Sequence, residues 1–164
     1  MRRVSFAVAL LSATMMFSLT FAAAAGEAKG TLTYKGTTAA LKYAELVRGP
    51  DAVDPTTIIR RLVLSTSDLS AKLKACDTMS CADGLVTEGM TVEFVDGPRL
   101  NYWVALKGGQ VQYSGTNEPD ALTATTDEPD QLAGTLTFDD TAADGPKVDV
   151  RFAAQLVKEF RAAP

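Results

Sequence analysis

Apolar and polar residues alternate near the C-terminal end of the chain, a pattern typical of strands buried on one face. The apolar positions of the clearest run are Val148, Val150, Phe152, Ala154 and Leu156. A second run, residues 132–138, alternates in the same way. Turn-forming residues between the two runs predict a connecting loop over residues 139–146.

A further hairpin is predicted around Gly108-Gly109, because alternating runs flank these two residues. Consecutive glycines accept the positive φ values of a type I′ turn. With a two-residue turn here, Val104 faces Tyr113. Leu106 then faces Val111, so that both halves present their apolar residues on the same face.

The remaining patterns complete an all-β fold. Further strands are expected at residues 38–48, 57–65 and 90–94. The strand at 57–65 is apolar on both faces, which predicts a central strand with another element covering its second side. Residues 68–75, with Leu69 and Leu73 four positions apart, predict a short helix. We therefore expect a single antiparallel β-sandwich or barrel-like domain with one short helix.

One pentapeptide pattern occurs twice. Residues 30–34 read Gly-Thr-Leu-Thr-Tyr and residues 134–138 read Gly-Thr-Leu-Thr-Phe, and similar return strands follow at 42–47 and 151–157. A duplicated hairpin, with its two copies adjacent in the sheet, explains the repeat. Convergence of two amphipathic hairpins on strand-favouring residues explains it equally.

Residues 1–25 have the three parts of a secretory signal peptide. Two arginines follow Met1, an apolar run extends from Val4 to Phe21, and four alanines then supply small residues for cleavage. The run is about long enough for a membrane-spanning helix, but the small-residue site and the charged sequence after it favour cleavage. We expect an exported β domain, residues 26–164, that is periplasmic or secreted and has no stable membrane insertion once the signal is removed.

Two cysteines, Cys76 and Cys81, lie close together in the expected exported domain. Nearby thiols in an oxidising compartment usually pair, so we expect a structural disulfide. Two thiols make only half of a metal site, and redox motifs usually place two residues between their cysteines. Free or regulatory thiols are the remaining alternative.

Composition excludes several classes of function. The chain has no histidine, which rules out a Ser-His-Asp triad, a His-activated cysteine and a His-ligated zinc site. All 20 acidic residues but only 14 of the 16 basic ones lie in residues 26–164, without a basic stripe, so nucleic acid is a poor partner. No Gly-x-Ser-x-Gly elbow or phosphate-binding glycine loop occurs. We expect no cofactor.

Three side chains are candidates for ligand contact. Arg60 and Arg61 are adjacent on an apolar strand, so they point to opposite faces, and one of them faces the core side. A guanidinium there needs a carboxylate or a bound anion. Trp103 lies on the more polar face of its strand, where it contacts a ligand or partner, or is covered by a loop such as residues 76–89.

Residues 117–131 are rich in acidic side chains and contain no base. The carboxylates are Glu118, Asp120, Asp127, Glu128 and Asp130. Carboxylate oxygens suit calcium, but the spacing matches no calcium loop such as the EF-hand. Prolines and acids also form solvated turns, which is the preferred interpretation.

The strand patterns at residues 30–44, 61–65 and 148–154 resemble small exported bacterial β-domain proteins without an assigned activity. The resemblance implies a one-domain exported β protein and transfers no catalytic residue. We expect a non-enzymatic binding or interaction module whose partner is an unknown protein or a small ligand. A carboxylate-based hydrolase and a calcium-stabilised structural domain are the alternatives.

Overall fold

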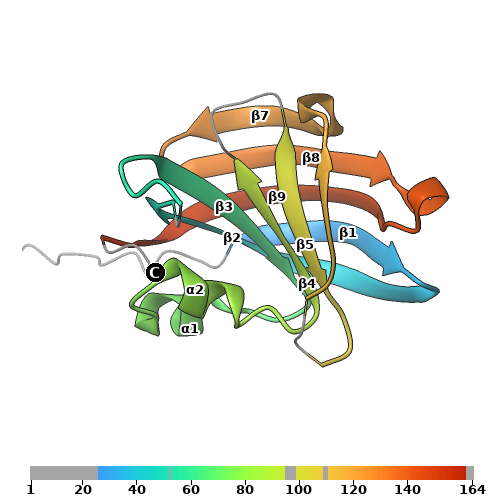
Figure 1. Cartoon of the computed structure of the whole chain (residues 1–164), viewed down its shortest axis with the longest axis horizontal. Coiled ribbons are helices and arrows are strands. Elements are labelled where there is room, and N and C mark those ends of the chain that lie inside the picture. Colours follow the sequence, from blue (N-terminus) through green and yellow to red (C-terminus); the bar gives the residue numbers. More distant parts are fainter. Residues whose placement is uncertain (1–25, 52, 95–98, 109–110, 162–164) are drawn as a thin grey trace, which may run out of the picture.

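Nine antiparallel strands form one strongly curled sheet, a half-barrel, in the part of the chain that the structure describes (Figure 1). This computed structural model describes residues 26–51, 53–94, 99–108 and 111–161. The expected signal peptide, residues 1–25, lies outside the described residues. The strands are β1 (Glu27–Tyr34), β2 (Thr37–Pro50), β3 (Ile58–Ser65), β4 (Gly89–Phe94), β5 (Leu100–Ala105), β6 (Val111–Asn117), β7 (Leu122–Glu128), β8 (Gln131–Asp139) and β9 (Lys147–Glu159).

The sheet order is β6-β5-β4-β3-β2-β1-β9-β8-β7, so nearly every strand pairs with its neighbour in sequence. The exception is the contact of β1 with β9, which joins the two ends of the chain into one sheet. Beyond the start of β1, β2 and β9 come together and pair in parallel from Glu45 to Arg48. The prediction of an all-β antiparallel domain is confirmed.

The inner face of the curl holds the main hydrophobic core. Tyr102 on β5 packs against Phe138 on β8, with ring centroids 4.9 Å apart, although these strands are not neighbours in the sheet. Tyr113 lies between Tyr102 and Tyr34, at centroid distances of 6.0 and 5.5 Å. The Tyr102 hydroxyl also donates a hydrogen bond of 2.5 Å to Asp140 Oδ2, beyond the end of β8. Aromatic side chains therefore join the two arms of the curled sheet.

A second core lies on the outer face, under the two helices α1 (Ser70–Ala75) and α2 (Met79–Asp83). Leu73 and Met79 from the helices pack with Val47, Val63 and Phe160 of the sheet and its C-terminal end. The predicted cover on the second side of β3 is confirmed (Figure 1). No helix among the described residues has the length and apolar character needed to cross a membrane.

Two expectations about local structure need correction. The helical cover contains two helices instead of the one that was expected. The second, α2, was missed because its five residues form a single turn, too few to show a helical period in the sequence. The acidic segment is also more regular than a series of turns, since Leu122–Glu128 form the edge strand β7. Its residues are exposed or half-buried on both faces, so no apolar alternation marks it in the sequence. The predicted glycine turn lies partly outside the described residues, at 109–110.

The repeated pentapeptide occupies related places in the sheet. Its copies lie in β1 and β8, and both strands flank β9. Gly30 faces Val150 and Gly134 faces Phe152, on opposite edges of β9. The two similar hairpins are therefore adjacent, an arrangement compatible with duplication and with convergence.

We predict that Tyr102→Phe lowers the free energy of unfolding by about 1.5 kcal/mol, because it removes a hydrogen bond to a carboxylate. Chemical denaturation measures this change. Tyr43→Phe is the matched control, since Tyr43 is half-buried and its hydroxyl makes no hydrogen bond with the described residues. Equal stability of the two variants would show that the Tyr102–Asp140 contact does not join the arms of the sheet.

Candidate functional site

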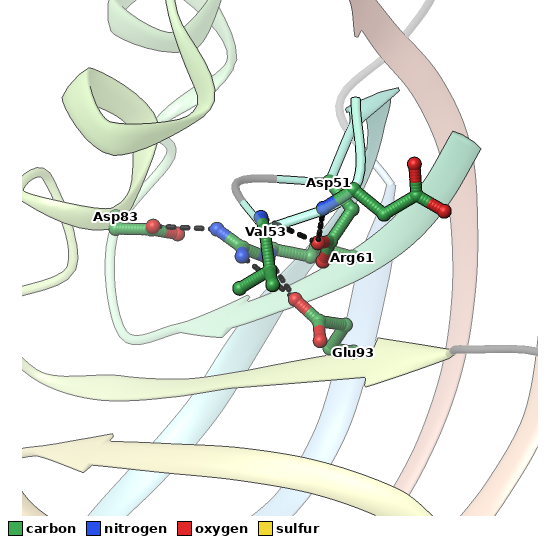
Figure 2. A network of polar contacts seen from close by, with 6 residues as sticks. Asp51, Val53, Arg61, Asp83 and Glu93 are labelled. Carbon is green, nitrogen blue, oxygen red and sulfur yellow. Dashed lines mark hydrogen bonds and ion pairs between the residues drawn. The ribbon is translucent and has the colours of Figure 1, made fainter. Parts of the chain in front are cut away.

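Arg61 is a charged side chain placed among the apolar residues of the outer core. It lies on β3 between Ile59 and Val63, which face the helices, and its side chain is only 12% exposed. An unpaired charge in such surroundings is costly, so the guanidinium needs carboxylates. Figure 2 shows two of them: Asp83 Oδ2 lies 2.5 Å from Nη1, and Glu93 Oε2 lies 2.7 Å from Nη2.

The two carboxylates come from different elements. Glu93 is directly opposite Arg61 in the β3–β4 pair and is 6% exposed, whereas Asp83 is the last residue of α2. The ion pairs therefore hold both a neighbouring strand and a helix to Arg61. Burial disfavours the charged guanidinium, but Asp83 and Glu93 together outweigh it and raise the pKa of Arg61. Burial also raises the pKa of Asp83, against the opposing effect of Arg61.

Trp103 lies beside this network on the outer face of β5. The Cζ atom of Arg61 is 5.5 Å from the centroid of the indole ring. Both side chains border a pocket of about 270 Å³ between the end of α2 and strands β4 to β6. Its lining consists of Arg61, Asp83, Val86, Thr91, Trp103, Ala105 and Val111. Two of the predicted contact residues, Arg61 and Trp103, are thus brought together.

Val111 reaches this pocket because of a β-bulge. Val104 faces Tyr113, as predicted, but Val111 faces Ala105 instead of Leu106. A shift of one residue turns a side chain to the other face of the sheet. Val111 was predicted to share a face with Val104 and Tyr113; it lies instead on the outer face, 58% exposed, as a wall of the pocket.

Arg60 points away from this site, as the alternation predicts. Its Nη2 lies 2.7 Å from Asp127 Oδ1, and its Nη1 donates a hydrogen bond of 3.1 Å to the carbonyl of Glu128. Arg48 lies beside it and pairs with Glu159 at 2.8 Å. A shallow hollow of about 380 Å³ borders these arginines and the end of β7. Arg60 therefore joins two parts of the sheet at the rim of the half-barrel.

The five acidic candidates for calcium do not gather at one point. Glu118 and Asp120 precede β7, whereas Asp127, Glu128 and Asp130 lie at its other end. A strand of seven residues separates the two groups by about 20 Å. Within the described residues, no group of three or more acidic or cysteine side chains is close enough to hold one metal ion.

The expected disulfide joins the two helices. Cys76 and Cys81 are bonded, with their Cα atoms 5.6 Å apart. Cys76 follows α1 and Cys81 lies inside α2, so the bond fixes the helix that carries Asp83. Cross-linking of this kind limits the freedom of the unfolded chain. The disulfide therefore supports one wall of the pocket.

Glu45 is a second buried acid under the helices. It is fully buried on β2, where Oε1 accepts a hydrogen bond of 3.2 Å from the N–H of Leu69 and Oε2 has no partner among the described residues. Burial raises the pKa of Glu45 from its ordinary 4.5 to about 7; the Leu69 bond opposes this and Asp68 adds to it. This carboxylate binds the start of the α1 segment to the sheet.

Comparison of the chain with protein-family models, with curated proteins and with solved structures found no match. The fold and the site therefore define the protein only as an antiparallel half-barrel with a helix-side pocket.

We predict that Arg61→Met destabilises the protein by about 3–5 kcal/mol, because it leaves the buried Glu93 without a partner. Adding Glu93→Gln should recover part of this loss. The adjacent Arg60→Met is the control and should cost at most about 1 kcal/mol, since its partner Asp127 is 54% exposed. Urea denaturation of the variants measures their free energies of unfolding. Equal losses of stability for the two arginine variants would contradict the prediction.

A pH dependence follows from Glu45. Its folded-state pKa lies above the ordinary value. The protein therefore loses stability as the pH rises from about 4.5, where Glu45 of the unfolded chain ionises, to about 7, where the folded carboxyl ionises. Glu45→Gln resembles the protonated form at every pH. We predict that its stability relative to the native chain rises by about 2–3 kcal/mol between pH 5 and pH 8. Denaturation at each pH measures the difference, with the exposed Glu27→Gln as control; a constant difference would contradict the prediction.

Proposed function

We propose that this chain is an exported, non-enzymatic binding module that holds a small ligand in the pocket between α2 and β5. The observation that carries the proposal is the lining: an ion pair, Arg61–Asp83, and one aromatic side chain, Trp103, beside apolar residues such as Val86 and Ala105. Mostly apolar pockets with a few directed polar groups are typical of small-molecule sites. A volume of about 270 Å³ suits a ligand of few atoms.

The division of the sheet into two faces supports this location. The inner face is filled by the main core, including Tyr102 and Phe138, whereas the outer face is covered by helices only in part. Trp103 is half-buried at the border of that cover. An incompletely covered aromatic side chain beside a pocket is a suitable contact for a ligand.

Export is part of the same proposal and rests on two observations. The segment of residues 1–25 has the pattern of a secretory signal, and the Cys76–Cys81 disulfide fits an oxidising compartment such as the periplasm or the cell exterior.

A carboxylate-based hydrolase is the second candidate. Asp83 lines the pocket and Glu93 lies beside Arg61, so the site contains an acidic pair, and the pKa of Asp83 is raised by burial. Both carboxylates are held by Arg61 in ion pairs, however, which gives them a structural task. We therefore rank hydrolysis below binding.

The single tryptophan of the chain provides the test. We predict that at least one compound from a library of small aromatic and aliphatic fragments changes Trp103 fluorescence saturably. Ala105→Leu fills the pocket from its floor and should abolish that response, whereas Ala124→Leu on the exposed edge strand β7 should preserve it. A saturable response that persists in folded Ala105→Leu protein, or no response to any fragment, would contradict the proposal.

A further inference from the structure

The charges at the pocket do not balance. Among the described residues, Arg61 is the only base in the lining, and it pairs with two carboxylates, Asp83 and Glu93. When all three groups are ionised, the cluster carries one net negative charge. Asp83 lines the pocket itself and its side chain is 45% exposed, so this excess charge is accessible to a ligand.

The aromatic wall of the pocket also attracts positively charged groups. Trp103 already has the guanidinium of Arg61 within 5.5 Å of its ring centroid, the distance of a cation–π contact. Its ring also borders a second hollow of about 340 Å³, along strands β5 and β6 beside Ser114. The indole is therefore accessible from more than one side, and its π surface favours a positive group.

An anion would meet the opposite situation. At Arg61 it would bring a third negative charge to one guanidinium, beside Asp83 and Glu93. Glu93 is 6% exposed, so displacing it would leave a buried carboxylate without a partner. The charge pattern thus disfavours carboxylate, phosphate and sulfate ligands.

We infer that the pocket binds a small organic cation: an ammonium group placed near Asp83 and Trp103, on an apolar body packed against Val86, Ala105 and Val111. This inference rests on the proposed binding function and specifies its ligand class. The apolar walls accept hydrocarbon, while the net negative charge and the indole select the sign of the ligand.

Three probes of similar size and different charge test the inference on the native protein: benzylammonium, benzyl alcohol and benzoate, titrated at pH 7.5 with Trp103 fluorescence and calorimetry as readouts. Benzylammonium should bind at least about five-fold more tightly than benzyl alcohol, the ratio expected for a unit charge about 4 Å away in water. Benzoate should bind most weakly. Equal affinity of the three, or tightest binding of benzoate, overturns the cation assignment.

Asp83→Asn tests the source of the selectivity. It should reduce the preference for benzylammonium over benzyl alcohol about five-fold, and the affinity for the neutral alcohol reports any change in pocket shape. Asp77→Asn makes the same change at an exposed residue of the loop before α2 and should leave the preference unaltered. An unchanged preference in Asp83→Asn overturns the role of Asp83.

The probes also separate this inference from the proposed function. If benzyl alcohol or benzoate binds in the pocket as tightly as benzylammonium, small-ligand binding stands and the cation class fails. If none of the three binds and the fragment library also fails, both proposals fail.

Discussion

The buried charge of Arg61 is the constraint on which the outer half of the molecule depends. A guanidinium between Ile59 and Val63 is tolerated only with carboxylates in contact, and Glu93 and Asp83 meet that need. Glu93 reaches it from the neighbouring strand through the sheet register. Asp83 reaches it from α2, so the position of that helix over the sheet is tied to the charge.

The two faces of the sheet are therefore stabilised by different interactions. The inner face is closed by aromatic packing around Tyr102 and needs no charge there, apart from the contacts at its rim. The outer face has a short helical cover, anchored by Arg61, Glu45 and the disulfide. That cover leaves Trp103 on β5 half-buried, and a pocket remains beside it. Arg61 and Asp83, which hold the helical cover to the sheet, therefore also line the pocket.

Much of the fold could be predicted from the sequence, because alternation in single strands is a local property. The predicted strands at residues 38–48 and 57–65 correspond to β2 and β3. β7 could not be predicted in this way, because both of its faces are solvated and it lacks an apolar period. The predicted face of Val111 was also wrong, because a β-bulge changes the alternation of side chains and depends on the pairing with the partner strand.

The candidate site was predicted only in part, for a similar reason. Arg61 and Trp103 were recognised as unusual on their own strands, but their proximity depends on two strand pairings and on the curl of the sheet. Glu93 could be identified only once β3 and β4 are paired, because in that register it is the residue opposite Arg61. Asp83 carries no such signal, since a single-turn helix has no register that the sequence specifies.

The most direct test of a ligand site on the outer face is NMR mapping of the ¹⁵N-labelled protein with added benzylammonium. The single indole N–H of Trp103 and the amides of Val86, Thr91 and Ala105 should shift together, while the amides around Tyr102 and Phe138 on the inner face stay unchanged. Shifts centred on the inner face, or at the rim near Arg60, would contradict a ligand site beside Trp103.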